Sequence, residues 1–197
     1  MDGDRLKWNA KHLSRIGPQS PSAIVTKFIP SVPPGKALDI AAGRGRNALY
    51  LARKGFEVDA VDISDQGLRS LTGKNPAVHP ICADLDQFDI AENRYQLIIS
   101  IRYLNRRLFP QMIRGLRTGG TLIFETFLEN GLQDDQHPCC RDHFFRANEL
   151  LHAFLSLNIR YYEEHLSHRA RRPAMVASLV AMKGSHRARQ AVRNRHY

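Results

Sequence analysis

The sequence predicts a doubly wound α/β fold, in which a mostly parallel sheet of seven strands carries helices on both faces. Short apolar runs alternate with amphipathic helical segments along most of the chain, as such folds require. One apolar run ends on Asp39 and enters a Gly-x-Gly turn, at Gly43 and Gly45, that opens onto a helical pattern. The last two strand-like runs are linked only by residues 167–173. That link is too short for a helical crossover, so this pair must be an antiparallel hairpin.

The leading part of the chain is predicted to be helical. Residues 5–15 form one helix, and residues 20–29 form a second, which Ser20 and Pro21 open as cap and first-turn residues. A Val-Pro-Pro-Gly run then ends the helical region. We therefore expect residues 1–30 to form a helical N-terminal cap.

The remaining elements follow from the same alternation. Strands are predicted at 36–40, 57–61, 78–81, 95–101, 120–127, 158–166 and 174–182. Helices are predicted at 45–54, 64–73, 105–117 and 146–156, with a turn at 118–120 before the fifth strand. One domain over residues 1–182 accounts for all of them.

The net charge of +10 is unevenly distributed. Residues 183–197 hold five basic residues and no acid, so they carry half of the excess. A basic segment with few large apolar residues is predicted to be a disordered tail. Such a tail suits contact with nucleic acid, although solubility alone also explains it.

Other broad features indicate a soluble, cytoplasmic protein that does not enter a membrane. No apolar run reaches the ~18 residues that a membrane helix needs, and the N-terminus has no apolar signal core. The three cysteines do not make a disulfide framework, so reduced thiols are expected. Cys139 and Cys140 lie in a long non-periodic stretch, 130–143, which we expect to be a lid or substrate loop. Adjacent cysteines are poorly placed to share one tetrahedral ion, so no metal site is predicted.

Polar residues gather at the predicted carboxyl ends of the first four strands, where ligands bind in doubly wound sheets. Asp39 ends the first strand, Asp62 follows the second, Asp84 follows the third and Ser100 lies near the end of the fourth. An acid placed like Asp62 accepts hydrogen bonds from ribose hydroxyls. Asp84 suits an adenine amino group, so the pattern predicts a nucleotide-like cofactor.

Two cofactors compete for this pattern. The Gly-x-Gly-x-x-Ala run at 43–48 also satisfies the dinucleotide fingerprint, and Asp62 suits NAD equally well. Asp39 favours S-adenosylmethionine, because a buried carboxylate without a partner is costly and this cofactor brings an ammonium and a sulfonium. Asp84 and the terminal hairpin favour it too, although Asp84 also suits a helix or turn cap.

Two stretches, Asp39–Ala52 and Gly55–Ser64, resemble the class I S-adenosylmethionine-dependent methyltransferases, and within them the small tellurite-resistance-type (TehB-like) branch. Further similarity to that branch lies in the Arg5–Ala10 lead, Leu116–Gly120 and Asn148–Leu150. The resemblance covers residues 5–182. It implies a Rossmann-like methyltransferase sheet of seven strands that ends in an antiparallel hairpin.

The resemblance also assigns roles within the predicted cofactor site. It implies that Gly43 and Gly45 lie against the methionine end of S-adenosylmethionine. It also implies that Asp62 binds the ribose and that Asp84 binds the adenine amino group. Thr118 stands where the family usually has proline, which a turn tolerates. The complete set of expected cofactor contacts is Asp39, Ala41, Gly43, Gly45, Asn47, Asp62, Ile63, Asp84, Leu85 and Ser100.

The segment after the fourth strand narrows the chemistry. It reads Ser100-Ile-Arg-Tyr103, without the Asn/Asp-Pro-Pro-aromatic turn of adenine or glutamine N-methylation and without a cysteine nucleophile. No general base is evident, and a nucleophile held in line with the methyl group does not need one. We therefore expect catalysis by positioning and assign no catalytic residue. The substrate-side candidates are Trp8, Arg102, Tyr103 and Arg169, of which Tyr103 also suits the core and Arg102 also suits solvent.

Positive charge near the predicted rim favours an anionic substrate. Residues 93–124 contain six arginines and no acid, and the loop at 168–173 adds more. A basic rim would steer an anion toward the site. As an alternative, Arg107, Arg114 and Arg117 lie at near-helical spacing on a solvated face.

The first predicted helix leaves two interpretations open. Trp8, Asn9 and His12 suit a cap folded over the cofactor, whereas Trp8 and Leu13 equally suit the apolar face of a packing helix. Deletion of the helix would separate the two by its effect on cofactor affinity.

The sequence therefore predicts an S-adenosylmethionine-dependent methyltransferase that acts on a small molecule. Three alternatives stay open: a methyltransferase for RNA or protein that uses the basic rim and tail, a non-catalytic S-adenosylmethionine-binding module, and an NAD-dependent oxidoreductase. Neither the methyl acceptor nor the oligomeric state follows from the sequence.

Overall fold

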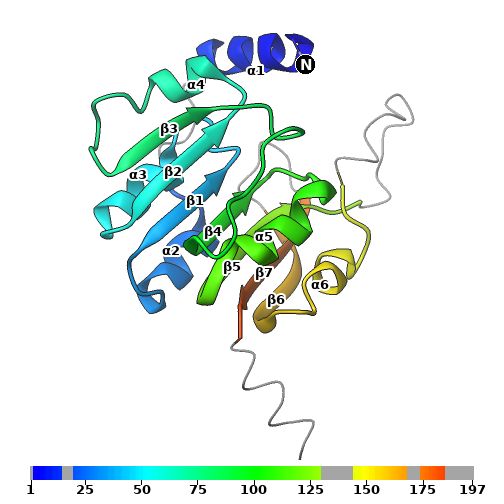
Figure 1. The fold of residues 1–197 in the computed structure, drawn as a ribbon. Helices are drawn as coiled ribbons and strands as arrows, with labels where there is room; N and C mark the ends of the chain where they lie inside the picture. The colour runs from blue at the N-terminus through cyan, green and yellow to red at the C-terminus, as the bar shows by residue number, and fades with distance from the viewer. Residues whose placement is uncertain (1, 15–19, 130–143, 168–173, 185–197) are drawn as a thin grey trace, which may run out of the picture.

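The fold is a seven-stranded sheet with helices on both faces (Figure 1). A computed structural model describes residues 2–14, 20–129, 144–167 and 174–184. The strands are β1 (Lys36–Ile40), β2 (Glu57–Asp62), β3 (Val78–Cys82), β4 (Tyr95–Ile101), β5 (Leu116–Phe127), β6 (Asn158–Ser167) and β7 (Ala174–Met182). Their order is β3-β2-β1-β4-β5-β7-β6.

Strand direction confirms the predicted topology. The pairs from β3 to β5 are parallel, whereas β7 is antiparallel to both β5 and β6. The sheet therefore ends in the expected hairpin, and β6 runs parallel to the first five strands. The strand order reverses between β1 and β4, and ligands of doubly wound sheets bind beyond the carboxyl ends at that point.

Alternation along the strands divides the core between the two faces of the sheet. The helices are α1 (Asp2–Ser14), α2 (Ala23–Phe28), α3 (Arg46–Arg53), α4 (Asp65–Arg69), α5 (Phe109–Gly115) and α6 (Glu149–Ala153), with short 3₁₀ turns η1 (Ile29–Ser31) and η2 (Arg106–Leu108). Leu38 and Phe124 point to the face that α5 and α6 cover. Ala37 and Ile123 point to the face of α2 and α3.

Several predicted helices prove shorter. The second begins at Ala23 after Ser22, whose backbone N–H donates to Asn47 Oδ1 over 2.9 Å, so Ser20 and Pro21 do not open it. The helix predicted at 105–117 is divided into η2 and α5, and the chain is extended from Leu116. Gly115 packs so closely on Ile90 that a Cβ would lie 2.5 Å from it, and this contact ends the helix against the core.

The fifth strand starts earlier than predicted. The turn expected at 118–120 is an irregularity inside β5, because the pairing with β4 jumps from Leu116 to Thr121. Gly119 has a φ of +79°, and its N–H donates to the carbonyl of Lys183. Glycine is suited to that left-handed conformation.

Lys183 belongs to the folded domain, which corrects the predicted start of the tail. Its ammonium donates to the carbonyls of Leu116 (2.6 Å) and Arg114 (3.0 Å) and to Asn93 Oδ1 (3.1 Å). The Arg114 carbonyl lies in the last turn of α5, where a cation is favourable. Residues 185–197, the rest of the predicted tail, lie outside the described residues.

Candidate active site

The turn after β1 contains three residues in the left-handed region. Ala41, Gly43 and Gly45 have φ values of +56°, +57° and +72°. At Gly45 a Cβ would lie 2.0 Å from Leu71 Cδ2, so only glycine fits there. Ala41 adopts the same region without being glycine, and such strain concentrates at functional sites.

Asp39 is buried without a full set of partners. Its side chain is 2% exposed, and Oδ2 has no hydrogen-bond partner among the described residues. Burial raises the pKa of Asp39 to about 7. The backbone N–H of Ala48 and the charge of Arg46 act in the opposite direction and lower this pKa. A buried carboxylate in this state favours a cationic ligand group.

Asp62 fastens the glycine turn to the next strand. Its Oδ2 accepts the N–H of Gly43 and its Oδ1 accepts that of Ser64, both over 2.8 Å. Each carboxylate oxygen keeps a second lone pair for a ligand hydroxyl. The structure thus brings Asp39, Asp62 and the turn together at one edge of the sheet.

The other predicted cofactor contacts have local partners or lie in the core. Asp84 Oδ1 accepts the N–H of Asp86 over 3.0 Å, as the cap interpretation requires. Leu85 is 4% exposed and belongs to the core on the α5 face, and fully buried Ser100 donates to the Tyr103 carbonyl over 3.4 Å.

Asn47 and Ile63 complete this set. The Asn47 amide oxygen accepts the N–H of Ser22, so Asn47 joins α3 to α2. Ile63 is half-buried beside Asp62, and its carbonyl accepts the Cys82 thiol, with 3.6 Å between sulfur and oxygen. Contact of these two residues with a cofactor stays a prediction, as it does for Asp84, Leu85 and Ser100.

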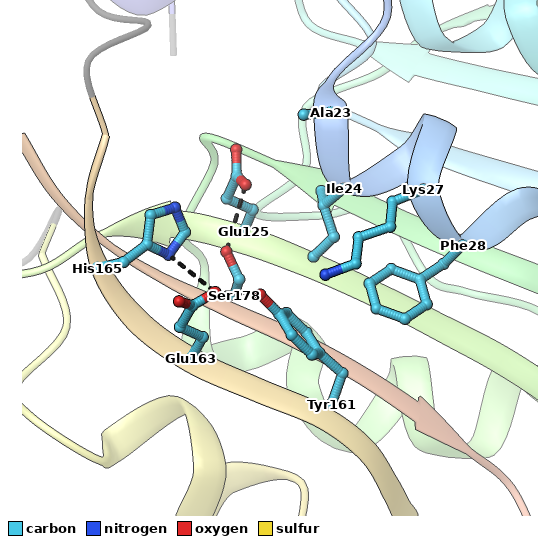
Figure 2. Close-up of a pocket in the computed structure, with 9 residues that line it drawn as sticks. All are labelled: Ala23, Ile24, Lys27, Phe28, Glu125, Tyr161, Glu163, His165 and Ser178. Atoms are coloured by element: carbon cyan, nitrogen blue, oxygen red, sulfur yellow. Dashed lines mark hydrogen bonds and ion pairs between the residues drawn. The ribbon is translucent and has the colours of Figure 1, made fainter.

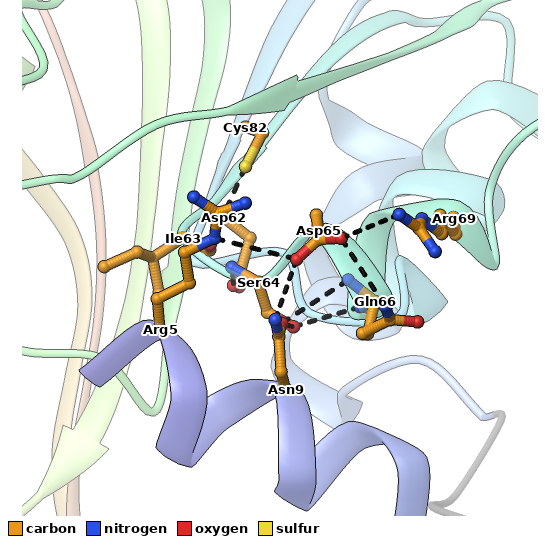
Figure 3. A network of polar contacts seen from close by, with 10 residues as sticks. Arg5, Asn9, Asp62, Ile63, Ser64, Asp65, Gln66, Arg69 and Cys82 are labelled. Carbon is orange, nitrogen blue, oxygen red and sulfur yellow. Dashed lines mark hydrogen bonds and ion pairs between the residues drawn. The ribbon is translucent and has the colours of Figure 1, made fainter. Parts of the chain in front are cut away.

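Helix α1 lies against this edge of the sheet (Figures 1 and 3). Asn9 donates to Asp65 Oδ1 over 2.8 Å and accepts the Ser64 hydroxyl over 2.7 Å. The imidazole of His12 borders the glycine turn, because a Cβ on Gly43 would lie 3.1 Å from its Cε1. Trp8, which is 36% exposed, stacks on His12 with 6.1 Å between ring centroids.

Two substrate-side candidates follow β4, beside the point where strand order reverses. Arg102 has a φ of +60°, and its Nε is buried without a hydrogen bond to any described residue. Its backbone N–H donates to the Glu125 carbonyl over 2.6 Å. Burial raises the pKa of Tyr103 to about 12. Arg169, the third, lies outside the described residues.

Most arginines of the predicted basic rim form ion pairs. Acids from other segments pair with four of the six, in Arg94–Asp59 (3.7 Å), Arg106–Glu149 (2.6 Å), Arg107–Asp89 (3.1 Å) and Arg114–Glu92 (3.0 Å). A count of charges along residues 93–124 could not reveal these partners. These ion pairs reduce the net charge of the rim, while the basic loop at 168–173 lies outside the described residues, so an anionic substrate stays a prediction.

A pocket of about 130 Å³ lies between α2 and strands β5, β7 and β6 (Figure 2). Glu125, Ser178 and Glu163 are direct neighbours in the strand register and form a polar row across its floor. Sequence reasoning missed this pocket and also Arg46. Glu125 could have been predicted from the sequence. It lies near the carboxyl end of the fifth strand, and ligands of doubly wound sheets bind at the carboxyl ends of strands.

Two further features are absent from the described residues. No group of three or more His, Cys, Asp or Glu residues is placed to hold a metal ion. None of the described helices is long and apolar enough to cross a membrane. The Cys139–Cys140 pair lies outside the described residues.

Comparison with known sequences connects the chain to one family. A family model described as "Tellurite resistance protein TehB" matches residues 19–175. A relative named "Probable S-adenosyl-L-methionine-dependent methyltransferase TehB", from Haemophilus influenzae, is 26% identical over 144 residues, which cover 68% of this chain and 50% of that protein. The demethylmenaquinone methyltransferase of Renibacterium salmoninarum is 27% identical over 109 residues, covering 53% and 46%. The chain spans about half the length of these curated relatives.

Solved structures share the fold. The crystal structure of TehB from Haemophilus influenzae superposes with a TM-score of 0.71 at 22% identity and covers 83% of this chain and 62% of that one. Phosphoethanolamine N-methyltransferase 2 of Haemonchus contortus, in complex with S-adenosyl-L-methionine, gives 0.65 at 15% identity, covering 83% and 52%.

Proposed function

The chain belongs to the TehB family, and we propose that it is a methyltransferase that transfers the methyl group of S-adenosylmethionine to a small molecule. Asp39 carries the proposal. A carboxylate that is 2% exposed, with one oxygen that no described residue bonds, fits the cationic aminoacyl end of this cofactor, which NAD lacks.

The neighbouring residues fit the rest of the cofactor. The left-handed turn at Gly43 and Gly45 lets a ligand approach the backbone closely. Asp62, held by two backbone N–H groups, suits the ribose hydroxyls. Asp84 is proposed for the adenine amino group.

Catalysis is proposed to rest on positioning. When bound, S-adenosylmethionine supplies an electrophilic methyl group on its sulfonium. The chain's own part is to fix both reactants, which alone lowers a barrier by several kcal/mol, up to about 10. Arg102 and Tyr103, next to the reversal of strand order, are proposed to hold the acceptor.

The N-terminal helix is proposed to cover the cofactor. It contacts the start of α4 through Asn9 and the glycine turn through His12, both of which belong to the candidate site. Trp8 and Arg169 remain proposed substrate contacts. A cytoplasmic location and nucleic-acid contact through residues 185–197 also remain proposals.

A methyl-transfer screen tests the function. The protein is incubated with methyl-labelled S-adenosylmethionine and, separately, with the small-molecule, RNA and protein fractions of a cell extract, with Asp39→Asn as the control. We expect label in the small-molecule fraction alone, and none with the variant. Label in RNA or protein would favour the second hypothesis. Binding of S-adenosylhomocysteine without any transfer would favour a non-catalytic module.

A further inference from the structure

The pocket beside α2 combines acidic and aromatic walls (Figure 2). Glu125, Ser178 and Glu163 cross its floor on three adjacent strands, and Ser178 donates to Glu125 Oε2 over 3.3 Å. Phe28 and Tyr161 form an aromatic pair with 5.0 Å between ring centroids. The apolar residues on this face of the sheet include Ile99, Ile123 and Val180, and the polar row lies beside them.

The charge of the pocket favours a cation. The carboxylates of Glu125 and Glu163 face it, and His165 Nδ1 is buried there, 3.7 Å from Glu163, without a hydrogen bond to the described residues. Burial and a hydrogen bond to Glu163 raise the pKa of Tyr161 to about 12, and the charges of Glu163 and Glu125 add to this.

The pocket already holds one ammonium group. Lys27 Nζ lies 4.5 Å from the centroid of the Tyr161 ring and 5.1 Å from that of Phe28. Aromatic faces attract ammonium groups at such distances. The Lys27 ammonium group lies at the end of a flexible four-carbon side chain. It can therefore move away from these rings when a ligand binds there.

The pocket adjoins the candidate active site. Glu125 is the register partner of Ile101 at the end of β4, and its carbonyl accepts the N–H of Arg102. Burial lowers the pKa of Arg46, as does the charge of Arg102, while the carboxylates of Asp39 and Glu125 oppose this. Arg46 thus lies in the field of both the glycine turn and the pocket.

We propose that this pocket anchors the methyl acceptor by a cationic amine group, held between the carboxylates of Glu125 and Glu163 and the rings of Tyr161 and Phe28. The inference rests on the proposed methyltransferase function and names its substrate class. At about 130 Å³ the pocket takes a group of roughly benzene size, because cavities near 150 Å³ bind benzene. A second part of the acceptor would then extend toward the end of β4, where Arg102 and Tyr103 are proposed to hold it.

Three probes of similar size that differ in charge test the preference for a cation. Benzylamine, benzyl alcohol and benzoate are titrated into the full chain by calorimetry, with and without saturating S-adenosylhomocysteine. We expect benzylamine to bind at least tenfold more tightly than either of the others. Equal binding of the three, preference for benzoate, or no binding of benzylamine overturns the proposal.

Variants locate the binding. Glu125→Gln and Glu163→Gln should each weaken benzylamine, by about tenfold for Glu125, since hydrogen bonds to charged groups contribute more than neutral ones. Lys27→Met, which removes the internal ammonium, should strengthen it. Glu92→Gln, an exposed acid paired with Arg114, is the matched control and should change nothing. Equal affinity in Glu125→Gln and the control contradicts the assignment.

The two proposals fail separately. If the protein binds S-adenosylhomocysteine but does not prefer benzylamine, the acceptor pocket is refuted and the proposed methyltransferase function stands. If the protein binds benzylamine selectively but does not bind S-adenosylhomocysteine, the proposed methyltransferase function is refuted.

Discussion

The buried carboxylate of Asp39 is proposed to bind the cofactor, but its ionised form destabilises the ligand-free protein. Its burial raises the pKa to about 7, from 3.8 for a free aspartate, so the folded protein holds a proton that the unfolded chain releases. Stability from this group is therefore fully present below about pH 4 and is lost as the pH rises through about 7. Above that pH range Asp39 is a buried carboxylate, which a cationic ligand group would stabilise.

Replacement of Asp39 should separate these roles. We expect Asp39→Asn to stabilise the ligand-free protein at pH 8 by about 1 to 3 kcal/mol and to change it little at pH 4. Urea unfolding at the two pH values measures the difference. A variant less stable than the wild type at pH 8 would show that the ionised carboxylate has a partner.

Gly45 offers a test of steric fit with an internal control. Gly45 and Gly73 have φ values of +72° and +73°, but a Cβ meets Leu71 at 2.0 Å in the first and nothing within 4 Å in the second. Gly73→Ala should cost about 1 to 2 kcal/mol from backbone strain alone. Gly45→Ala should cost at least about 2 kcal/mol more, from the overpacking. Equal urea midpoints in the two variants would refute the close packing of the turn.

Residue chemistry at strand ends could be predicted from the sequence, but pairing could not. Asp39 stands out because a buried acid in an apolar strand is costly without a partner, and Asp62 stands out because it ends the strand that follows the glycine turn. The partners of Arg106 and Arg107, by contrast, come from residues 43 and 18 positions away along the chain. Only the fold brings such charges together, so a local charge count overstated the basic rim.

At the scale of elements, α1 is held by polar contacts rather than by an apolar face. Leu6 and Leu13 are 68% and 73% exposed, while Asn9 bonds to Ser64 and Asp65. This departs from the packing-helix interpretation based on Leu13. A helix fixed by a few hydrogen bonds is easily displaced, as a cap over a cofactor must be.

Asn9 therefore tests the cap. Asn9→Ala should weaken S-adenosylhomocysteine binding by up to about 30-fold, because two hydrogen bonds of about 1 kcal/mol each hold α1 in place. Lys7→Ala, an exposed position on the same helix, is the control. Calorimetry with both variants measures the effect, and identical affinities would mean that α1 only packs on α4.

Element boundaries were the weakest predictions, for tertiary reasons. The helical pattern of 105–117 continued past Gly115 in the sequence, yet close packing on Ile90 and pairing of Leu116 with Tyr95 turn the chain into β5. Hydrogen bonds from Lys183, remote in sequence, then hold that junction.

At the scale of the molecule, the mostly parallel sheet and its antiparallel terminal hairpin agree with the sequence prediction, because the links between strands decide strand direction. The short link between β6 and β7 excludes a crossover, and α3, α4 and α5 supply helical crossovers between the parallel strands β1, β2 and β3 and between β4 and β5. The pocket beside α2 was missed because it forms where three strands and a helix meet, which no single segment reveals.

The central claim is that Asp39 recognises the cationic aminoacyl end of S-adenosylmethionine. Calorimetry with S-adenosylhomocysteine and with methylthioadenosine, which lacks that end, measures this recognition in the wild type and in Asp39→Asn. We predict that the wild type prefers S-adenosylhomocysteine by about 10- to 100-fold, as a charged hydrogen bond provides, and that the variant loses most of this preference. The same preference in both proteins would contradict the account.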